Sequence, residues 1–474
     1  MIKTFKHGIH PADRKALSKD RAIHPIDAPT ELVYPLGQHI GAPATACVTV
    51  GERVLAGQRI AEAAGFVSAP IHSAVSGTVK AIELRMNPSG DRVTSIVIEN
   101  DGMDEWITPA PWIDKAHDAE TVSAAMATDL VKNMTSDGIR AAVRDAGIVG
   151  LGGAGFPMSV KLTPRNAEAI DYLIVNGAEC EPYLTSDYRL MLERGDELLA
   201  GCALLLRLFP NARCVIGIEN NKNDAIRMLT ERARAYEGVS VCKLKAKYPQ
   251  GGERMLIHAV TGRDLDSSRL PADVGCIVVN VASTVAAFRA IAYGQPLTHR
   301  VVTVTGDGVA SPSNPEIAIG TSYRELLVSV GGFADGSGIA PEKVITGGPM
   351  MGSAMFDLDV PVTKTSASIL AMAKDPVSLR DPSACIRCGR CVRACPEHLL
   401  PRELSIAADD DRFDTFERLG GMECIECGSC AYVCPAKRHL VQSMRYGKRQ
   451  TGAIIRARRA AEAAEKEKKG GDRA

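Results

Sequence analysis

The sequence predicts an α/β protein built from several domains, and three observations support this prediction. The chain has 474 residues, enough for about three domains of ordinary size. Its central part alternates apolar runs of strand length with helical segments, which is typical of a doubly wound, mostly parallel sheet. Glycine-punctuated β-like segments flank this part on both sides, and a cysteine-rich segment lies near the C-terminus.

The composition argues against several classes of protein. Lys and Arg number 56 and Asp and Glu also number 56, so the balanced charge gives no indication of nucleic acid binding. No apolar run is long enough to span a bilayer, so we expect a soluble or peripheral protein. The chain shows no signal peptide, and we expect a reducing, cytoplasmic environment for its 14 cysteines.

The N-terminal part is predicted to contain a β module. Residues 1–30 are expected to be irregular, whereas 31–99 contain short β-like runs separated by glycine turns. The segments 48–60 and 69–82 resemble the two halves of a barrel-sandwich domain of the biotinyl/lipoyl type. In such carrier domains the turn between the halves holds a modifiable lysine, and the turn at 61–67 has none. We therefore expect a structural module without attached biotin or lipoate.

A glycine-rich loop follows helices that are predicted within 116–147. The run 150–161 reads G-L-G-G-A-G-F-P-M-S-V-K, and its first, third and sixth residues satisfy G-x-G-x-x-G. A Rossmann fingerprint needs a helix that opens at the third glycine, and Pro157 fits that poorly. The glycines still offer a backbone surface suited to a phosphate or a flat ring, and Lys161 adds a positive charge.

Polar residues follow the predicted strands of the central domain. The apolar run 171–175 leads to Asn176, Glu179 and Glu181. Because ligands of open α/β sheets bind at the carboxyl ends of the strands, this cluster is a candidate site, the alternative being an ordinary solvated turn. Further strands are predicted at 212–218, 239–244 and 276–279, a helix at 224–236, and a loop at 248–254 before another helix. The strand at 276–279 leads to Asn280 and Thr284.

The segment 299–364 is predicted to be β-rich and resembles a small β-grasp module. Its β-like runs are 300–308, 321–330 and 344–352. A polar linker that contains prolines is predicted near 374–383. The tail from about residue 446 is basic and has helical propensity, and we interpret it as a solvated helix.

Two copies of the run C-x2-C-x2-C-x3-C-P begin at Cys385 and Cys424. This run ligates [4Fe–4S] clusters in two-cluster ferredoxins, where the fourth cysteine of each run binds the other cluster. Gly389 and Gly428 allow backbone amides to approach the cluster sulfides. One cluster is therefore assigned to Cys385, Cys388, Cys391 and Cys434, and the other to Cys395, Cys424, Cys427 and Cys430.

Structural zinc and disulfides are the alternative interpretations of these cysteines. Zinc sites often use two C-x-x-C pairs and rarely repeat a four-cysteine run with a trailing proline, and disulfides are typical of small secreted domains. The insert 404–419 between the runs has helical character, so we expect an α-helical domain that relays electrons. The six isolated cysteines, expected to be buried and unreactive, are Cys47, Cys180, Cys202, Cys214, Cys242 and Cys276.

Several of these motifs, taken together and in order, resemble the FMN- and NADH-binding subunit of respiratory complex I. They are the loop 150–161, the run Asn176-x-x-Glu179-x-Glu181-Pro182, the loop 251–253, and the later pair Asn280 and Thr284. With the barrel-sandwich module, the β-grasp module and the two cysteine runs, nearly the whole chain resembles the RnfC family of the Rnf electron-transport complex.

The complex I resemblance implies a set of site residues. Those implied to hold or flank FMN are Gly150, Gly152, Gly153, Lys161, Asn176, Gly251, Gly252, Glu253, Asn280 and Thr284. Those implied to face NADH are Phe156, against the adenine, and Glu179 and Glu181, the implied catalytic pair, at the nicotinamide side. Three positions depart from the complex I pattern, because Leu151, Ala178 and Val281 stand where that family usually has Arg, Asp and a second Asn. Some hydrogen bonds to FMN or NADH are therefore expected to be absent or replaced.

The Rnf resemblance implies a flavin and iron–sulfur subunit of an ion-translocating NAD:ferredoxin oxidoreductase. It implies non-covalent FMN, two [4Fe–4S] clusters and NADH as substrate, with electron flow in either direction. The implied partners are integral membrane and flavin-bearing subunits and a ferredoxin-linked iron–sulfur subunit, at the cytoplasmic face of the bacterial cell membrane. The alternatives are a cobalamin reductase, which as a family begins near the flavin domain, and an electron-relay scaffold without nucleotide binding.

These observations predict the following division of the chain. The predicted parts are 1–115 with the barrel-sandwich module, 116–298 as the Rossmann-like FMN and NADH domain, 299–372 as the β-grasp (SLBB-like) module, 373–445 as the two-cluster ferredoxin domain and 446–474 as a charged helical tail.

Overall fold

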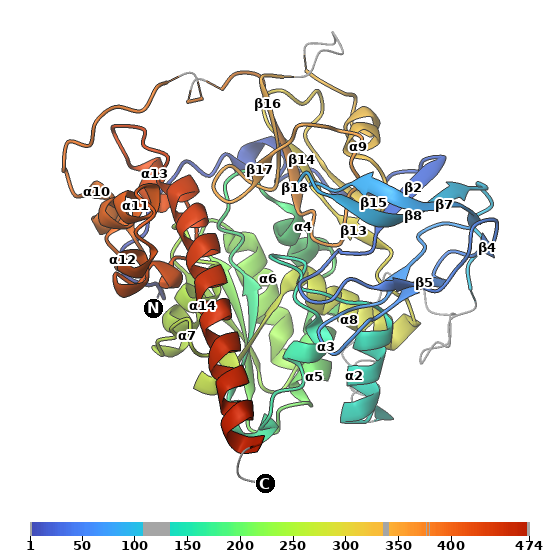
Figure 1. The fold of residues 1–474 in the computed structure, drawn as a ribbon. Helices are drawn as coiled ribbons and strands as arrows, with labels where there is room; N and C mark the ends of the chain where they lie inside the picture. The colour runs from blue at the N-terminus through green and yellow to red at the C-terminus, as the bar shows by residue number, and fades with distance from the viewer. Residues whose placement is uncertain (1, 108–132, 335–340, 376, 379, 472–474) are drawn as a thin grey trace.

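The computed structural model consists of a central α/β domain, β-rich modules packed on it, and a cysteine-rich helical domain at its side (Figure 1). The residues it describes are 2–107, 133–334, 341–375, 377–378 and 380–471. The predicted helices at 116–132 lie outside the described residues, as do residues 376 and 379 of the predicted linker.

The central domain is built on a four-stranded parallel sheet in the order β11-β10-β9-β12. Its strands are β9 (Tyr172–Gly177), β10 (Arg213–Glu219), β11 (Val239–Leu244) and β12 (Cys276–Asn280). Strands buried on both faces are expected to be continuously apolar, and the central residues of β9, β10 and β12 are buried. Strands β10 and β11 follow β9 on one side of the sheet, whereas β12 lies on the other side of β9. The strand order therefore reverses between β9 and β12.

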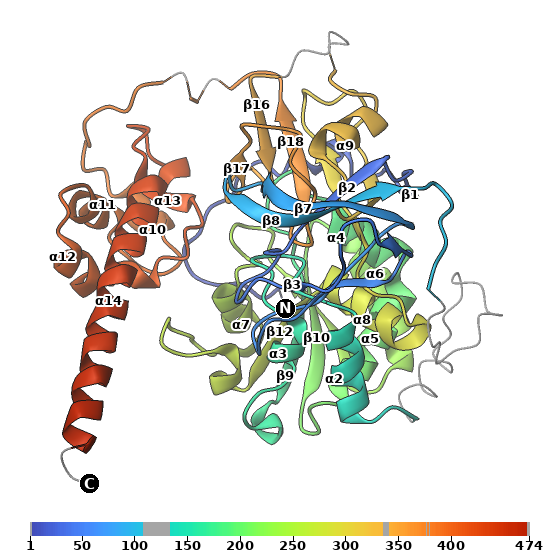
Figure 2. The same cartoon turned by 45° about the vertical axis from the view of Figure 1, so that its right-hand side comes forward.

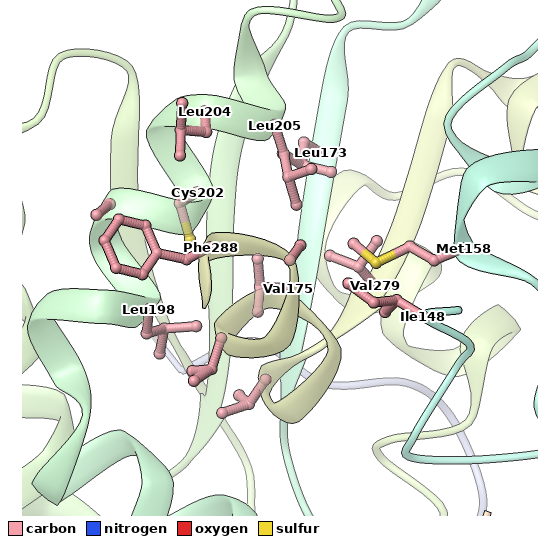
Figure 3. Packing of buried hydrophobic residues seen from close by; sticks show 14 of the residues in the cluster. Ile148, Met158, Leu173, Val175, Leu198, Cys202, Leu204, Leu205, Val279 and Phe288 are labelled. Atoms are coloured by element: carbon pink, nitrogen blue, oxygen red, sulfur yellow. The ribbon is translucent and has the colours of Figure 1, made fainter. Parts of the chain in front are cut away.

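Helices cover both faces of this sheet. Their bounds are α2 (Ser136–Asp145), α3 (Met158–Lys161), α4 (Ser186–Glu193), α5 (Gly195–Leu206), α6 (Asn223–Arg232), α7 (Glu253–Thr261) and α8 (Val281–Tyr293). Leu173 and Val175 of β9 pack with Leu198 of α5 and Phe288 of α8 on one face (Figure 3). Ile174 faces the other way and packs with residues of α7. This period-2 alternation sorts the side chains of one strand into two cores.

The N-terminal module folds as two small antiparallel sheets around its own core. The strands are β2 (Glu31–Pro35), β3 (Thr45–Ala46), β4 (Arg53–Val54), β5 (Arg59–Glu62), β6 (Ile71–His72), β7 (Gly77–Met86) and β8 (Arg92–Asn100), in the orders β2-β8-β7-β4 and β3-β5-β6. Leu32, Ile60 and Ile98 are among its fully buried residues. Ala318 of the second β module joins this core, so the two modules share an apolar interface.

In its described residues, the second β module contains two sheets and one α-helix. Its strands are β13 (His299–Val301), β14 (Thr303–Thr305), β15 (Asn314–Ala318), β16 (Lys343–Thr346), β17 (Ser353–Ala354) and β18 (Ser368–Met372). The prediction of a β-like run at 321–330 is wrong, because α9 (Tyr323–Ser329) forms there. Ser322 and Glu325 form a capping box at its start, and Tyr323, Leu326 and Leu327 are buried on one side of the helix.

The C-terminal domain is helical, as predicted from the insert between the cysteine runs. Its helices are α10 (Arg390–Ala394), α11 (Pro401–Asp409), α12 (Phe413–Arg418), α13 (Ser429–Tyr432) and α14 (Leu440–Gly471). Phe416 is the centre of its small core, and a Cβ on Gly421 or Gly447 would overlap the Phe416 ring. Helix α14 begins inside this domain and projects away from the cysteine runs (Figure 2).

Residues 2–30 contain little regular structure, yet they are tied to the central domain and to the second β module. Lys3 bridges to Leu244 at the end of β11, and Ile9 bridges to Tyr248 in the following loop. The short strand β1 (Ile23–Pro25) pairs in parallel with β15 of the second β module. This segment therefore crosses the carboxyl end of the central sheet on its way to the barrel-sandwich module.

Candidate functional site

The candidate site lies where the strand order of the central sheet reverses. Asn176 at the end of β9 and Asn280 at the end of β12 are register partners there. The Asn176 amide donates to the carbonyl of Gly251 at 2.8 Å. Asn280 accepts from the Ala282 N–H at 2.8 Å and so caps helix α8. Crevices at such switch points are the usual ligand sites of doubly wound sheets.

The glycine loop lies directly over Asn280. A Cβ on Gly152 would lie 2.5 Å from the Asn280 Nδ2 atom, so only glycine allows this approach. The loop is closed by a hydrogen bond from the Gly150 N–H to the Phe156 carbonyl at 2.9 Å, and the Phe156 side chain is half-buried beside it. On the opposite side the loop is open, because a Cβ on Gly153 would meet no described atom within 4 Å.

Lys161 brings two further predicted segments together. Its ammonium donates to the Glu253 carboxylate at 2.8 Å and to the Val278 carbonyl at 3.2 Å. The two side chains are 30% and 40% exposed, so this ion pair is accessible and a stronger anion can compete for Lys161. Glu253 is the first residue of α7, which follows Gly251 and Gly252.

Glu179 is almost entirely buried. Its backbone has a φ of +46°, and its side chain is 3% exposed. The carboxylate accepts from the Asp187 N–H at 2.8 Å at the first turn of α4 and lies 3.5 Å from the Lys15 ammonium. Glu179 thus stabilises the start of a helix, and its role in catalysis stays a prediction.

Glu181 is held by the second β module. Its carboxylate accepts from the Met350 N–H at 2.6 Å and from the Met351 N–H at 3.1 Å. A Cβ on Gly348 would overlap the Glu181 side chain, so glycine is required at this contact. Burial raises the pKa of Glu181, whereas the two N–H donors favour its ionised form.

Thr284 is placed beneath the site rather than in it. The residue has no exposed surface, and its hydroxyl donates to the Asn280 carbonyl at 2.9 Å one turn earlier in α8. A Cβ on Gly201 of α5 would lie 3.0 Å from the Thr284 methyl group, so helix α5 covers it closely. Thr284 therefore supports the Asn280 backbone, and its contact with a flavin stays a prediction.

Three charged residues that the motifs did not single out lie at this site, the half-buried Asp187 and the buried Lys15 and Lys222. Asp187 accepts from the Asn280 amide at 2.7 Å, and burial, with Glu179 nearby, raises the pKa of Asp187 to about 7. Lys15 donates to the Glu181 carbonyl at 3.1 Å, and Lys222 donates to the Ala178 carbonyl at 2.6 Å. Lys222 follows β10, so the rule that placed Asn176 at a strand end could have found it. Lys15 carries no comparable signal.

The eight cysteines of the two runs surround two separate cavities. The inner set, Cys395, Cys424, Cys427 and Cys430, lines one cavity. The outer set, Cys385, Cys388, Cys391 and Cys434, lines a second, more open one. In the described part of the chain, no three His, Cys, Asp or Glu side chains converge as ligands of one metal ion. Each cavity is lined by four cysteines, the number of thiolates that ligate one cubane cluster, and each set combines both runs.

The inner set lies against the central domain and the second β module, whereas the outer set faces solvent. The Tyr248 hydroxyl donates to the Cys427 carbonyl at 2.7 Å, and a Cβ on Gly428 would lie 2.9 Å from the Met350 carbonyl oxygen. Burial raises the pKa of the Cys424 thiol to about 11, so iron binding must displace protons from the inner set. Cys385 and Cys388 of the outer set are exposed.

The six isolated cysteines are not all buried, contrary to the expectation. Cys202, Cys214 and Cys276 are buried in the cores of the central domain. Cys47 is exposed, which contradicts the expectation for that residue. Cys180 is half-buried and its sulfur accepts from the Gly251 N–H at 3.2 Å, which places it at the candidate site.

Comparison with known proteins finds relatives along almost the whole chain. The C subunit of the "Proton-translocating ferredoxin:NAD(+) oxidoreductase complex" of Clostridium ljungdahlii is 43% identical over 96% of this chain and 95% of the relative. The C subunit of the "Na(+)-translocating ferredoxin:NAD(+) oxidoreductase complex" of Acetobacterium woodii is 42% identical over 96% of this chain and 98% of the relative. The chain belongs to the RnfC family.

Family models match four parts of this RnfC family member. They are described as the RnfC barrel sandwich hybrid domain at 3–103, the Nuo51 FMN-binding domain at 143–289, the SLBB domain at 301–354 and a 4Fe-4S dicluster domain at 378–435. The predicted fold class is therefore confirmed. The chain spans only about half of a longer family member, the C subunit of the "Ion-translocating oxidoreductase complex" of Pseudomonas aeruginosa, at 41% identity over 87% of this chain.

One solved structure shares the fold. The "Crystal structure of NAD+-reducing [NiFe]-hydrogenase in the H2-reduced state" contains a chain that aligns with a TM-score of 0.51 at 19% identity. The alignment covers 72% of this chain and 65% of that chain, and at this identity it shows the fold alone. Among the described residues, no helix combines the length and the apolar character needed to cross a membrane.

Proposed function

We propose that this chain is the FMN and iron–sulfur subunit that exchanges electrons with NADH in a membrane-bound, ion-translocating NAD:ferredoxin oxidoreductase. The single observation that carries the proposal is that the carboxyl end of the flavin-type sheet and the inner cysteine set meet through Tyr248 and Met350. A nucleotide site and a one-electron relay are thereby joined in one chain. The names of the Rnf relatives support the same activity.

The residues at the switch point fit FMN. The glycine loop presents open backbone at Gly153, and Lys161 offers an accessible cation for a phosphate. Asn176 and Asn280 place amide groups at the two strand ends, and both are oriented by hydrogen bonds to the protein. FMN, when bound, supplies the chemistry that exchanges a hydride with NADH and single electrons with clusters.

The chain's own residues orient the site. Asp187 holds the Asn280 amide, and Lys15 holds the Glu181 backbone. Glu181, fixed by the Met350 and Met351 amides, is the carboxylate we assign to the nicotinamide side. Phe156, beside the glycine loop, is the residue we assign to the adenine. Pre-oriented groups of this kind hold a substrate in one geometry at little further entropic cost.

The positions of the two cysteine sets indicate the order in which electrons would pass through the two clusters. The inner set would hold the cluster nearer the flavin site, and the outer set would hold the cluster nearer solvent, with Cys395 and Cys434 each crossing to the other run. We assign the chain to the cytoplasmic face of the membrane, where NADH is available. Its partners would be the integral membrane and flavin-bearing subunits and a ferredoxin-linked iron–sulfur subunit.

The proposal is tested with anaerobically purified, full-length protein. We expect non-covalent FMN, about eight iron atoms and bleaching of the flavin absorbance on addition of NADH. Lys161→Ala should lose FMN, whereas Glu181→Gln should keep FMN but slow its reduction by NADH, because the neutral amide accepts weaker hydrogen bonds. Protein that holds flavin and both clusters but shows no bleaching with NADH would contradict the proposed function, and the electron-relay scaffold would replace it.

A further inference from the structure

The surroundings of the two cysteine sets differ in charge. Four arginines, Arg387, Arg390, Arg402 and Arg438, line the outer cavity, together with a single acidic residue, Glu403. Glu403 pairs with Arg402, and Arg438 lies 3.8 Å from Asp409. In the part of the chain that the structure describes, Arg387 and Arg390 form no ion pair, and both are exposed.

The inner cavity has no arginine or lysine in its lining. Two glutamates line it, and they are paired from outside the cavity, Glu397 with Arg254 and Glu426 with Arg445 and Lys448. Both cavities are suited to the same type of cluster, which carries the same charge in each. The inner set has one cation beside it, Lys448, which donates to the Cys424 carbonyl at 2.7 Å but is paired with Glu426. The outer set differs in that two of its lining arginines, Arg387 and Arg390, form no ion pair among the described residues, so their charge is available to a partner.

Apolar side chains accompany these arginines at the surface. Ile386 is 69% exposed and Leu400 is 44% exposed, and both line the outer cavity. We call Ile386, Arg387, Arg390, Leu400, Arg402 and Arg438 the outer face. Exposed apolar residues next to unpaired arginines are typical of interface cores, where arginine is enriched.

We propose that the outer face is the docking surface for an acidic face of the partner protein that carries the next one-electron centre. This inference rests on the proposed function and names the partner surface of the same relay. An electron can leave the exposed outer set only toward another redox centre, so the occupant must be a protein with such a centre rather than a lipid surface. Unpaired arginines select acidic partners and accelerate their encounter.

The test uses full-length, cluster-loaded protein and membrane vesicles that carry the remaining subunits of the complex but lack this chain. Association is measured by anaerobic sedimentation, and electron delivery by NADH-driven reduction of centres in the vesicles. The variant is Arg387→Gln combined with Arg390→Gln. The matched control is Arg227→Gln, an exposed arginine of α6 in the central domain. Leu400→Ser is a second variant of the outer face that leaves both cysteine runs intact.

We expect the double variant to associate at least about tenfold more weakly at low salt, with a shallower salt dependence than wild type, because two charge contacts are removed. Leu400→Ser should also weaken association, and Arg227→Gln should not. Bleaching of the flavin by NADH and the EPR signals of both clusters are recorded for every variant, so that association is compared among proteins that hold both clusters. If the double variant loses the outer cluster, Leu400→Ser decides the test.

Three outcomes would overturn the docking surface. The first is wild-type association by both outer-face variants. The second is slower electron delivery with unchanged association, which would assign the arginines to the cluster alone. The third is equal, arginine-dependent binding to protein-free vesicles of phosphatidylglycerol, which would make an anionic membrane the occupant. A wild-type protein without NADH-driven bleaching would instead contradict the proposed function, so the two failures are distinguishable.

Discussion

The substitution Gly153→Ala distinguishes an effect on FMN binding from an effect on folding stability. The Cβ atom introduced there would have no described neighbour within 4 Å, and the backbone is not in the left-handed region. The folding stability of the flavin-free protein should therefore change by no more than about 0.5 kcal/mol. If the glycine loop holds FMN, the added methyl group must overlap the cofactor, at a cost of about 1–3 kcal/mol. The Kd for FMN should then rise by a factor of about 5–150.

The assay is a fluorescence titration of flavin-free protein with FMN, alongside denaturant unfolding of the same preparation. Gly65→Ala is the matched control, because it also meets no described atom within 4 Å and lies in the turn of the barrel-sandwich module. Gly152→Ala is the opposite case, since its Cβ would lie 2.5 Å from Asn280 Nδ2 and should perturb the protein even without FMN. Unchanged FMN binding by Gly153→Ala would refute the placement of the cofactor on this loop.

Three further predictions address the clusters and the buried lysine. Cys395→Ala should remove the EPR signal of the inner cluster and leave that of the outer one, and the reverse result would refute the crossed pairing. In an EPR redox titration the outer cluster should be reduced at a less negative potential than the inner, because it is exposed and lined by arginines; the opposite order would contradict this. Lys364 is fully buried, and burial lowers its pKa from 10.5 to about 7. Between these two pH values the unfolded chain therefore binds more protons than the folded chain. As pH falls from 10.5 to 7, Lys364 increasingly lowers the free energy of unfolding. Lys364→Met should abolish this dependence, which is at most about 5 kcal/mol, and equal pH dependence of denaturant unfolding in both proteins would contradict it.

The part of the site that follows strand ends could be predicted from the sequence. An apolar run followed by Asn176 or Asn280 indicates a strand end, and parallel strands bring such ends to one edge. The cysteine runs were equally informative, because their spacing is set by the geometry of the cluster they ligate. In both cases a local sequence pattern is sufficient to predict the site residues, because these residues are near in sequence or lie on strands of one sheet.

Contacts that depend on the path of the chain could not be predicted in this way. Lys15 reaches Glu181 over 166 positions, and nothing near Lys15 indicates that its segment crosses the sheet. The run Glu179-x-Glu181 does not reveal which carboxylate is buried, because that follows from the positive φ of Glu179. By contrast, the helix at 323–329 did have a signal, the capping box of Ser322 and Glu325, which the apolar run beside it obscured.

The contacts around the glycine loop explain what a carrier-like module without a modifiable lysine does in this chain. Arg300 of the second β module donates to the Leu151 carbonyl at 3.3 Å. Lys364 donates to the Gly147 carbonyl at 2.7 Å, just before the loop, and to the Pro70 carbonyl of the barrel-sandwich module at 2.6 Å. Both cations are buried, so each carbonyl they hold would otherwise lack a partner in a dry environment. Both β modules therefore help to hold the loop in position on the central domain. The barrel-sandwich module thus acts here as a fixed support of the flavin site.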